Sequence, residues 1–234
     1  KKQVDLLLNK GVDGILISLS NRTRDFKHLQ KILDYKVPLV LFDKIAKTIN
    51  CSKVIIDDRK AAYDAVTYLI KKGYKRISHF RGDLNPQNSI DRFLGYKKAL
   101  IDNDIPYDPS LVYICNNNLD FEDGYNSAKK LIEDHGDHVD AIFAVNDLIA
   151  IGAINYFNQK KIAIPEKIAL CGFSNWFMSS VISPSLSTIE QNAYKMGEKS
   201  TEILFQEIEY KHKNINVEYQ KVVIDTALVI RKST

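Results

Sequence analysis

Polar side chains that can donate and accept hydrogen bonds follow several apolar runs of strand length in this sequence. The clearest case is residues 139–154, VDAIFAVNDLIAIGAI, where an apolar run ends at Asn146 and Asp147 and a helical pattern follows. Such a run is typical of a strand buried on both faces of a sheet, and Gly152 and the alanines are expected to let the helix lie close to that sheet. Ligands bind at the carboxyl ends of strands in open parallel sheets. The pair therefore indicates a ligand contact, with a purely structural helix cap as the alternative.

The same placement recurs at other expected strand ends, and the side chains there are mostly amides and hydroxyls. These groups both donate and accept, while the planar fork of an arginine can bracket two neighbouring oxygens. With aromatic residues nearby, the mixture is typical of a site for a polyhydroxylated ligand such as a sugar. The candidate contacts are Ser18, Asp43, Asn85, Asn88, Arg92, Leu119, Phe121, Asn146, Ser174, Asn175, Trp176, Phe177 and Gln191.

Each candidate also has an interpretation that needs no ligand. Asp43 could make a turn, Arg92 could form a surface or interlobe ion pair, and Trp176 could pack inside the protein. Asp57 and Asp58 begin a helix and are not expected to form a catalytic acidic pair. The coincidence of polar residues at several strand ends favours binding more strongly than any single residue does.

The sequence contains no GxSxG, Walker, GxGxxG or HExxH motif, so no enzyme activity, catalytic residue or cofactor is predicted. Cys51, Cys115 and Cys171 are far apart and have no CxxC spacing. This pattern predicts buried, reduced thiols in a cytoplasmic protein rather than a disulfide framework or a metal site.

The composition is that of a soluble globular protein, with 234 residues, 45% hydrophobic and 26% charged. The net charge of +4 is scattered along the chain, which favours a solvated surface over a nucleic-acid-binding face. No apolar run approaches the roughly 18 residues that a membrane span needs. The opening residues, KKQVDLLLNKG, do not have the pattern of a signal peptide.

Strand and helix patterns alternate along the chain, which predicts an α/β fold with parallel sheets covered on both faces. Three expected strands precede Gly73 and four lie between it and Pro184, so we expect two doubly wound lobes joined by a multi-crossover hinge. The expected N-terminal lobe is 1–72 plus 191–220, and the C-terminal lobe is 73–190 plus 221–234. The first lobe opens on the end of a helix, so we expect a piece of a longer protein that lacks an initial strand, helix and strand.

Taken together, several stretches resemble the effector-binding core of the lactose-repressor/galactose-repressor family of bacterial transcription regulators. That family shares its type I fold with periplasmic sugar-binding proteins. The matching stretches, in family order over nearly the whole chain, are VDGILI, PLVLFD, DDRKAAYDAVTYLIKKGYKRISHF, RFLGYKKAL, FEDGYNSAKKLI, AVNDLIAIGAI, IPEKIALCGFSN and SPSLSTIEQNAYKMGEKS. The resemblance implies a DNA-binding helix-turn-helix domain and a hinge helix ahead of residue 1.

The resemblance also implies roles for individual residues. Arg92 matches the family arginine that grips effector oxygens. Ser174 stands where aspartate is common, Asn88 where a small hydroxyl residue is common, and Leu119 where an aromatic ring often stacks on the ligand. Phe121 or Trp176 could supply that ring, and a phosphorylated or non-sugar effector stays open. The residues placed around the effector are Asp43, Asn88, Arg92, Asn146, Ser174 and Gln191, with Ser18 at the edge.

The implied mechanism is a two-state hinge in a homodimer. An effector that touches both lobes favours the closed state, and this changes the spacing of two attached DNA-binding heads on an operator. We expect exposed apolar positions on the helices at 58–72 and 146–160 to contribute to the dimer interface. We also expect Arg92→Ala to abolish effector binding with the fold intact. The alternatives are an exported sugar-binding component of a transporter and, in another class, a sugar-phosphate or nucleotide-using enzyme of the same architecture.

Overall fold

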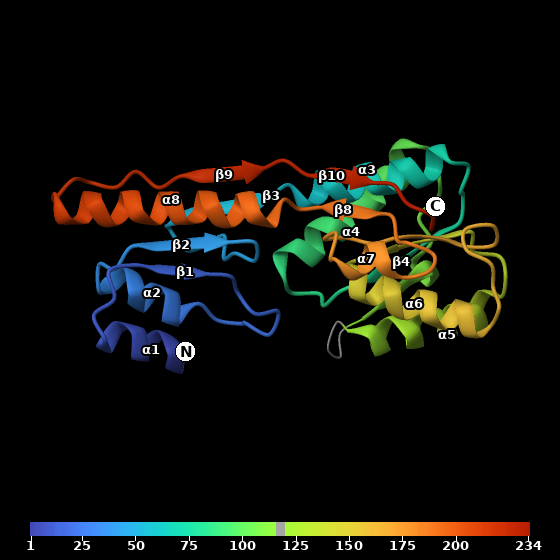
Figure 1. Cartoon of the computed structure of the whole chain (residues 1–234), viewed down its shortest axis with the longest axis horizontal. Helices are drawn as coiled ribbons and strands as arrows, with labels where there is room; N and C mark the ends of the chain where they lie inside the picture. The colour runs from blue at the N-terminus through green and yellow to red at the C-terminus, as the bar shows by residue number, and fades with distance from the viewer. Residues whose placement is uncertain (116–119) are drawn as a thin grey trace. The chain divides into compact units, whose positions relative to one another are not determined.

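The computed structural model describes residues 1–115 and 120–234, which fall into two compact units. Unit 1 comprises residues 1–57 and 192–225, and unit 2 comprises residues 58–191 and 226–234. Each unit is built around its own four-stranded parallel sheet (Figure 1). The two sheets confirm the predicted α/β class.

In unit 1 the strands have the order β1-β2-β3-β9. Leu39 and Leu41 point to one face of the sheet and share a core with the helices α1 and α2, because alternate residues of a strand face opposite sides. The long helix α8 packs on β1, β2 and β3 from the other face. The bounds are β1 (Ile15–Ile17), β2 (Leu39–Phe42), β3 (Ser52–Ile56), β9 (Lys221–Ile224), α1 (Lys2–Asn9), α2 (Lys27–Asp34) and α8 (Ala193–His212).

A buried carboxyl group lies between α8 and β3. Glu207 is only 3% exposed, and its Oε1 accepts a hydrogen bond from the hydroxyl of Ser52 at 2.5 Å. Burial raises the pKa of Glu207, and the hydrogen bond from Ser52 opposes this rise without cancelling it. The folded chain therefore holds a proton on this group over a pH range in which the unfolded chain has lost it.

In unit 2 the strands have the order β5-β4-β6-β7, and β8 and β10 form a separate antiparallel pair. Helices α3 and α4 pack together, as do α5 and α6. The strand bounds are β4 (Ile77–Arg81), β5 (Val112–Ile114), β6 (Ala141–Ala144), β7 (Ala169–Cys171), β8 (Thr188–Glu190) and β10 (Ala227–Val229). The helix bounds are α3 (Asp58–Lys71), α4 (Gln87–Asp102), α5 (Phe121–His135), α6 (Asp147–Gln159), α7 (Met178–Val181) and a 3-10 turn at Pro109–Leu111.

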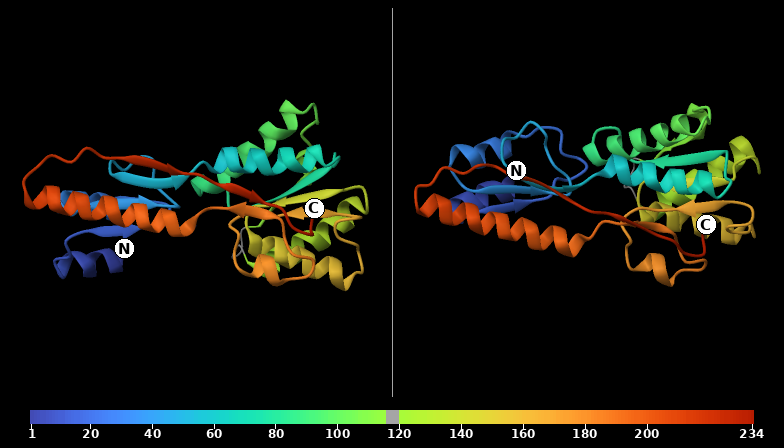
Figure 2. Two further views of the ribbon diagram at one scale, coloured as in Figure 1. Left: turned by 45° about the horizontal axis from the view of Figure 1, so that its top comes forward. Right: turned by 90° about the horizontal axis from the view of Figure 1, so that it is seen from above.

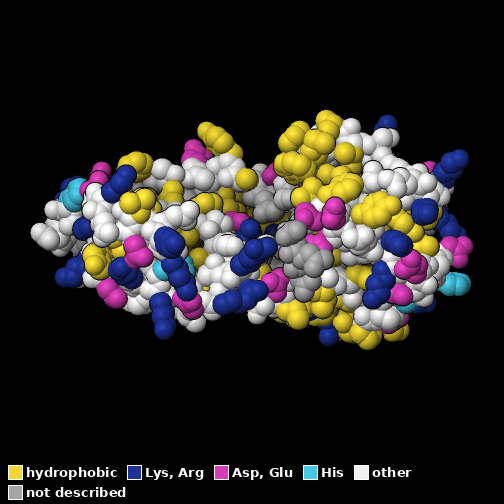
Figure 3. Space-filling model, turned by 90° about the horizontal axis from the view of Figure 1, so that it is seen from below, with side chains coloured by type: hydrophobic (Ala, Val, Ile, Leu, Met, Phe, Trp, Pro, Cys, Tyr) yellow, Lys and Arg dark blue, Asp and Glu magenta, His cyan; other side chains and the backbone are white. Residues whose placement is uncertain are grey.

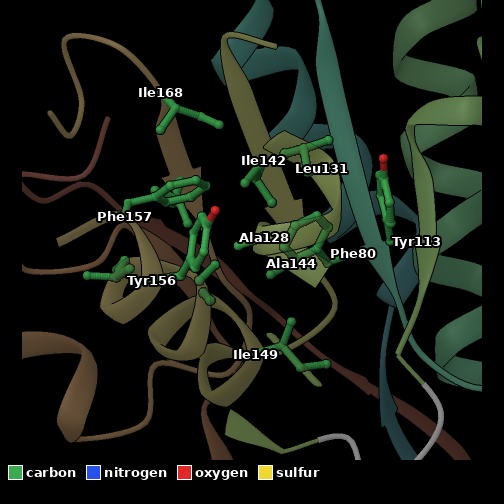
Figure 4. Packing of buried hydrophobic residues seen from close by; sticks show 14 of the residues in the cluster. Phe80, Tyr113, Ala128, Leu131, Ile142, Ala144, Ile149, Tyr156, Phe157 and Ile168 are labelled. Atoms are coloured by element: carbon green, nitrogen blue, oxygen red, sulfur yellow. The ribbon is translucent and has the colours of Figure 1, made fainter. Parts of the chain in front are cut away.

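The two faces of this sheet carry different cores. Phe80 and Ile142 pack with Leu131 of α5 and Phe157 of α6, in the cluster shown in Figure 4. On the other face, His79 of β4 stacks on the Tyr96 ring of α4, with ring centroids 5.0 Å apart. Because successive residues of a strand face opposite sides of the sheet, the neighbours His79 and Phe80 of β4 pack against different helices.

Gly152 lets two helices approach closely, although its neighbour is not the one expected from the sequence. A Cβ atom at this position would lie 2.0 Å from the backbone oxygen of Phe121 and 2.9 Å from the nitrogen of Tyr125. Both atoms belong to α5. The small residue therefore serves the contact between α5 and α6, and the expectation that it serves a helix-to-sheet contact was wrong.

The contacts of α3 place it in unit 2, whereas the expected lobe boundary lay after this helix. Helix α3 packs on α4 and β10, and the hydroxyl of Tyr68 lies 3.1 Å from that of Thr234. Similarly, β9 pairs with β3 in unit 1, although the division drawn from the sequence assigned residues 221–225 to the other lobe.

The surface of α3 and α6 does not have the apolar positions that were expected at a dimer interface. No large apolar side chain at 58–72 or 146–160, all within the described residues, is exposed. Tyr156 and Phe157, for example, are buried in unit 2 against neighbouring rings. The expectation of exposed large apolar side chains on these two helices was wrong, while their part in an interface and the homodimer itself stay predictions.

All three cysteines are buried and none forms a disulfide, as expected. In the described part of the chain, no helix combines the length and the apolar character that crossing a membrane requires.

Replacing Gly152 by alanine is expected to lower the free energy of unfolding by about 1–3 kcal/mol, because the backbone of α5 must move to admit a methyl group. The matched control is Gly197→Ala, since a Cβ atom there meets nothing within 4 Å. The control should be neutral or stabilising by up to about 1 kcal/mol, as alanine favours a helix interior. Urea denaturation measures both, and equal effects of the two substitutions would contradict the close contact.

Replacing Glu207 by glutamine is expected to stabilise the chain increasingly as pH rises above the ordinary glutamate pKa of 4.5. The sign follows from linkage: a raised pKa in the folded state means that the unfolding free energy of the native chain falls as pH rises through that window. The glutamine keeps an acceptor for Ser52 and cannot ionise. Urea denaturation at pH 4.5 and pH 8 tests this, with the exposed Glu198→Gln on the same helix as control. A stability difference that does not grow with pH would be inconsistent with a buried, protonated carboxyl.

Candidate functional site

Arg92 is the most constrained residue of the predicted site. It lies in α4 and is only 4% exposed. Its Nη1 donates to the carbonyl of Val145 at 2.6 Å, its Nε donates to Asp58 Oδ1 at 2.8 Å, and its Nη2 lies 2.8 Å from the same oxygen. The guanidinium also lies over the Phe173 ring, 3.5 Å from its centroid. Three other segments of unit 2 therefore fix the orientation of one cation on α4.

These contacts use only part of the hydrogen-bonding capacity of the side chain. An arginine has five N–H groups, and the contacts with Val145 and Asp58 engage one on each of its three nitrogens. Within the described residues, one further N–H on each terminal nitrogen of Arg92 is left over for other partners. Two donors on one planar guanidinium can pair with two neighbouring oxygens of a ligand.

Two amides of the predicted site are engaged with helix N-termini. Asn146 is the N-cap of α6, and its Oδ1 accepts from the backbone N–H of Ile149 at 2.8 Å. Asn88 lies in the first turn of α4 and accepts from the N–H of Ser89 at 2.9 Å. The structural interpretation of Asn146 as a cap is thus correct. A cap uses the amide oxygen and does not by itself exclude a ligand contact.

Asp147 follows β6 and links the start of β8 to the loop after β7. Its side chain is buried, with Oδ1 accepting from the hydroxyl of Thr188 at 2.5 Å and Oδ2 accepting from the backbone N–H of Trp176 at 2.7 Å. Burial raises the pKa of Asp147, and both hydrogen bonds work against that rise. The carboxylate therefore positions the backbone that carries Ser174 and Trp176.

A second cation holds the same loop from its other side. Arg231 donates to Asn175 Oδ1 at 2.6 Å and to the carbonyl of Leu186 at 2.7 Å. Asn175 in turn donates to Glu190 Oε2 at 2.6 Å. Ser174 has a φ of 115°, a conformation that side chains rarely adopt. The strained position is kept because the surrounding bonds over-determine it.

The aromatic candidates differ from one another in exposure. Trp176 is 44% exposed and Phe177 66% exposed, with their rings in an edge contact at 5.1 Å. Phe121 begins α5 and is 36% exposed. Trp176 is therefore not a core residue, and its ring surface is open to a partner.

In unit 1, two predicted residues lie at the carboxyl ends of neighbouring strands. Ser18 follows β1 and donates to Asp43 Oδ2 at 3.3 Å, while Asp43 follows β2. Asp43 has a φ of 55°, which is typical of a turn and agrees with the interpretation of this residue that needs no ligand. The structure thus brings these two side chains together within unit 1.

The remaining candidates divide as follows. Gln191 is partly buried at the end of unit 2, directly after β8. Asn85 lies in the exposed loop before α4, where it donates to Asp83 at 3.0 Å. Leu119 lies outside the described residues. No group of three or more potential metal ligands occurs among residues 1–115 and 120–234.

Sequence reasoning missed the residues that hold the predicted contacts in place. Asp58 was interpreted only as a helix start, yet it is the ion-pair partner of Arg92. Phe173 and Arg231 were not singled out at all. Asp147 carried one usable signal, because a carboxylate directly after a buried strand needs partners if it is itself buried.

Known proteins with similar sequences and structures share this architecture. The periplasmic binding protein-like domain family matches residues 66–234. The HTH-type transcriptional repressor PurR of Histophilus somni (strain 2336) is 30% identical over 234 residues, which is 100% of this chain and 68% of the relative. The structure of the transcription regulator CcpA of Lactococcus lactis matches with a TM-score of 0.88 and 27% identity, over 100% of this chain and 82% of that one.

A further solved structure, the transcriptional regulator CelR in complex with cellobiose, matches with a TM-score of 0.89 and 25% identity, over 100% of this chain and 69% of that one. The matched relatives are regulators, which argues against the enzyme and transporter alternatives. The extent of these matches and the fold of both units lead to one assignment. The chain belongs to the LacI family of transcriptional regulators, of which it forms the periplasmic-binding-protein-like effector-binding domain.

Proposed function

We propose that the effector is a small polyhydroxylated molecule, a carbohydrate, and that it is sensed by a cytoplasmic regulator. The observation that carries this proposal is the geometry of Arg92. Its guanidinium is held by Asp58, Val145 and Phe173, with one N–H left over on each terminal nitrogen. A pre-oriented fork of this kind suits a pair of vicinal hydroxyl oxygens, and little entropy is lost when they bind.

Further support comes from the chemistry at the strand ends of both units. Ser18 and Asp43 in unit 1 offer a hydroxyl and a carboxylate, while Ser174 and the exposed ring of Trp176 lie after β7 in unit 2. Asp43 and Ser174 both have positive φ values, and such backbone strain gathers at ligand sites. The related regulator CelR binds cellobiose.

A second candidate is a non-sugar or phosphorylated effector. Ser174 favours it, because a serine at this position provides no charged acceptor for sugar hydroxyls. Under either candidate, the effector stabilises one of two states of the regulator by its differential affinity for them. A coupling free energy of about 1–3 kcal/mol would change the affinity of the attached DNA-binding domains for an operator about 5–150-fold.

Arg92→Lys is expected to weaken effector binding by at least about tenfold, because one ammonium group cannot reproduce two parallel donors. The sugar is first found by a thermal-shift screen of mono- and disaccharides that includes cellobiose, and the affinity is then measured by calorimetry. The control is Arg59→Lys, since Arg59 forms an exposed ion pair with Asp91 on the neighbouring helix. Unchanged affinity in Arg92→Lys would refute the site, and a panel without any binder would refute the carbohydrate.

Arg92→Ala is a poorer test than the sequence suggested. The expectation of an intact fold does not suit a side chain that is 4% exposed and paired with a largely buried carboxylate. Removing one partner of a buried ion pair typically destabilises by about 3–5 kcal/mol. A loss of binding in this variant must therefore be read beside its unfolding curve.

We further propose that the regulator acts as a homodimer on operator DNA, through DNA-binding domains attached to this one. Two heads joined in a dimer can match half-sites about one helical turn apart. Sedimentation velocity at micromolar concentration is expected to give a dimer. A monomer that persists as concentration rises would contradict this part of the proposal.

A further inference from the structure

The sheet of unit 1 has an unpaired edge at β9. This strand is the last in the order β1-β2-β3-β9, and it runs along the border of the sheet (Figure 1 and Figure 2). It pairs in parallel with β3, and within residues 1–115 and 120–234 no strand pairs with its other side. An edge of this kind presents N–H and C=O groups to which another strand can bond.

The register of β9 identifies the backbone groups that face away from the sheet. Lys53 of β3 pairs with Lys221, and its N–H donates to the carbonyl of Gln220 at 2.8 Å. Successive residues of a strand direct their N–H and C=O groups to opposite sides. The groups of Gln220 and Val222 therefore face β3, while those of Lys221 and Val223 face outward.

A hollow of about 550 Å³ lies beside this edge, between β9 and the first half of α8. Val223 lines it and is 50% exposed, although valine is a residue that proteins usually bury. The described part of the chain thus leaves the edge uncovered as well as unpaired. The complete lining is Lys195, Glu198, Lys199, Glu202, Val222, Val223, Ile224 and Asp225.

The sequence of this strand is complementary to itself when it is reversed. Residues 221–225 read KVVID, with a cation at one end, an anion at the other and three β-branched residues between them. In an antiparallel pair of two copies centred on Val223, Lys221 lies opposite Asp225 of the second copy. Val222 then lies opposite Ile224, and Val223 opposite itself. Opposite charges and β-branched residues are pairs that stabilise neighbouring strands.

The hydrogen-bonding pattern fits the same centre. The outward-facing residues 221, 223 and 225 become the hydrogen-bonded pairs of an antiparallel ladder when Val223 lies on the two-fold axis. Centring the pair on Val222 would instead place groups that are already bonded to β3 on the axis. The carbonyl of Asp225 accepts from Asn192 Nδ2 at 2.6 Å and has a second lone pair for the copy.

The charges at the two ends of the strand are available to a partner. Neither Lys221 nor Asp225 forms an ion pair with the residues that the structure describes. The α8 side chains along the hollow are two lysines and two glutamates, so they carry no net charge and do not repel a copy. Charge complementarity therefore favours a second copy of this chain over a strand of another sequence.

Other surfaces of unit 1 do not offer the same match. The strand at the opposite edge, β1, reads ILI and has no charges that would fix the register of a copy. The face of unit 1 that is seen from below carries Lys, Arg, Asp and Glu side chains interspersed with one another (Figure 3). Such a mixture is typical of a surface that stays in water.

We propose that β9 pairs antiparallel with β9 of a second copy of the chain, about a two-fold axis through Val223. The two four-stranded sheets then join edge to edge. This pairing supplies an interface for the homodimer proposed above, and it rests on that self-association and not on the identity of the effector. Few residues take part, so the contact is weak and depends on protein concentration.

Sedimentation equilibrium over a concentration series at low ionic strength tests the pairing. Lys221→Glu and Asp225→Lys, each alone, place like charges opposite each other twice in the pair, and each should raise the dissociation constant about tenfold. The double variant Lys221→Glu/Asp225→Lys restores opposite charges and should associate as the native chain does. The control Lys10→Glu changes the net charge by the same amount at an exposed position after α1 and should have no effect. Circular dichroism confirms that each variant is folded.

Disulfide cross-linking locates the axis. Val223→Cys places two thiols directly opposite each other, with Cα atoms about 5.5 Å apart, which is within the range of disulfides. The three native cysteines are buried, so mild oxidation of this variant should give a linked dimer. The matched control is Leu6→Cys on α1, where the native side chain is 55% exposed, and it should link only by random collision.

Weaker association of both single charge variants, its recovery in the double variant and a linked Val223→Cys dimer support the pairing. If the native chain dimerises but the single variants associate equally well, or if Val223→Cys links no faster than Leu6→Cys, the β9 interface is overturned and the homodimer stands. A native chain that stays monomeric over the whole series overturns both, and it leaves this edge to an extended segment of another protein.

Discussion

A buried guanidinium that water does not reach needs contacts with other protein groups, and this requirement ties the elements of unit 2 together. Arg92 is 4% exposed, so its charge is matched by Asp58, one N–H group on each of its nitrogens by an acceptor, and its flat face by the Phe173 ring. The partners come from the start of α3, the end of β6 and the loop after β7. The position of each element is therefore tied to the others through one side chain.

Asp147, an acidic side chain, also connects separate segments of unit 2. Its carboxylate accepts from Thr188 and from the backbone of Trp176, and in this way it fixes the loop on which Ser174 adopts its unusual conformation. Arg231 completes the arrangement from the far side of Asn175. Residues that could contact a ligand are thus held by residues that need not touch it, which is how a binding site keeps its geometry before the ligand arrives.

Unit 1 handles charge differently. The carboxyl of Glu207 is buried with one hydroxyl partner, whereas the basic residues of the loop after β1 line an open hollow. A buried acid lowers its cost by keeping a proton, but arginines cannot lose theirs and so stay charged toward solvent.

By itself, the sequence determined the elements and the edge at which polar residues gather. Apolar runs alternating with helical patterns are local, and they lead directly to two parallel sheets with Ser18, Asp43, Asn146 and Ser174 after their strands. The family stretches then carried the assignment as a regulator. Leu119 illustrates the limit of that reasoning, because its position is not among the described residues.

The tertiary structure alone decided which residues meet across long separations. Asp58 lies 34 residues before Arg92, and Val145 lies 53 after it. Gly152 was expected to face the sheet and instead admits the backbone of α5, and α3 belongs with unit 2 although a glycine that ends it looked like a boundary. Local periodicity reports which face of an element is apolar but not which distant element will cover it, because that choice depends on the packing of the whole core.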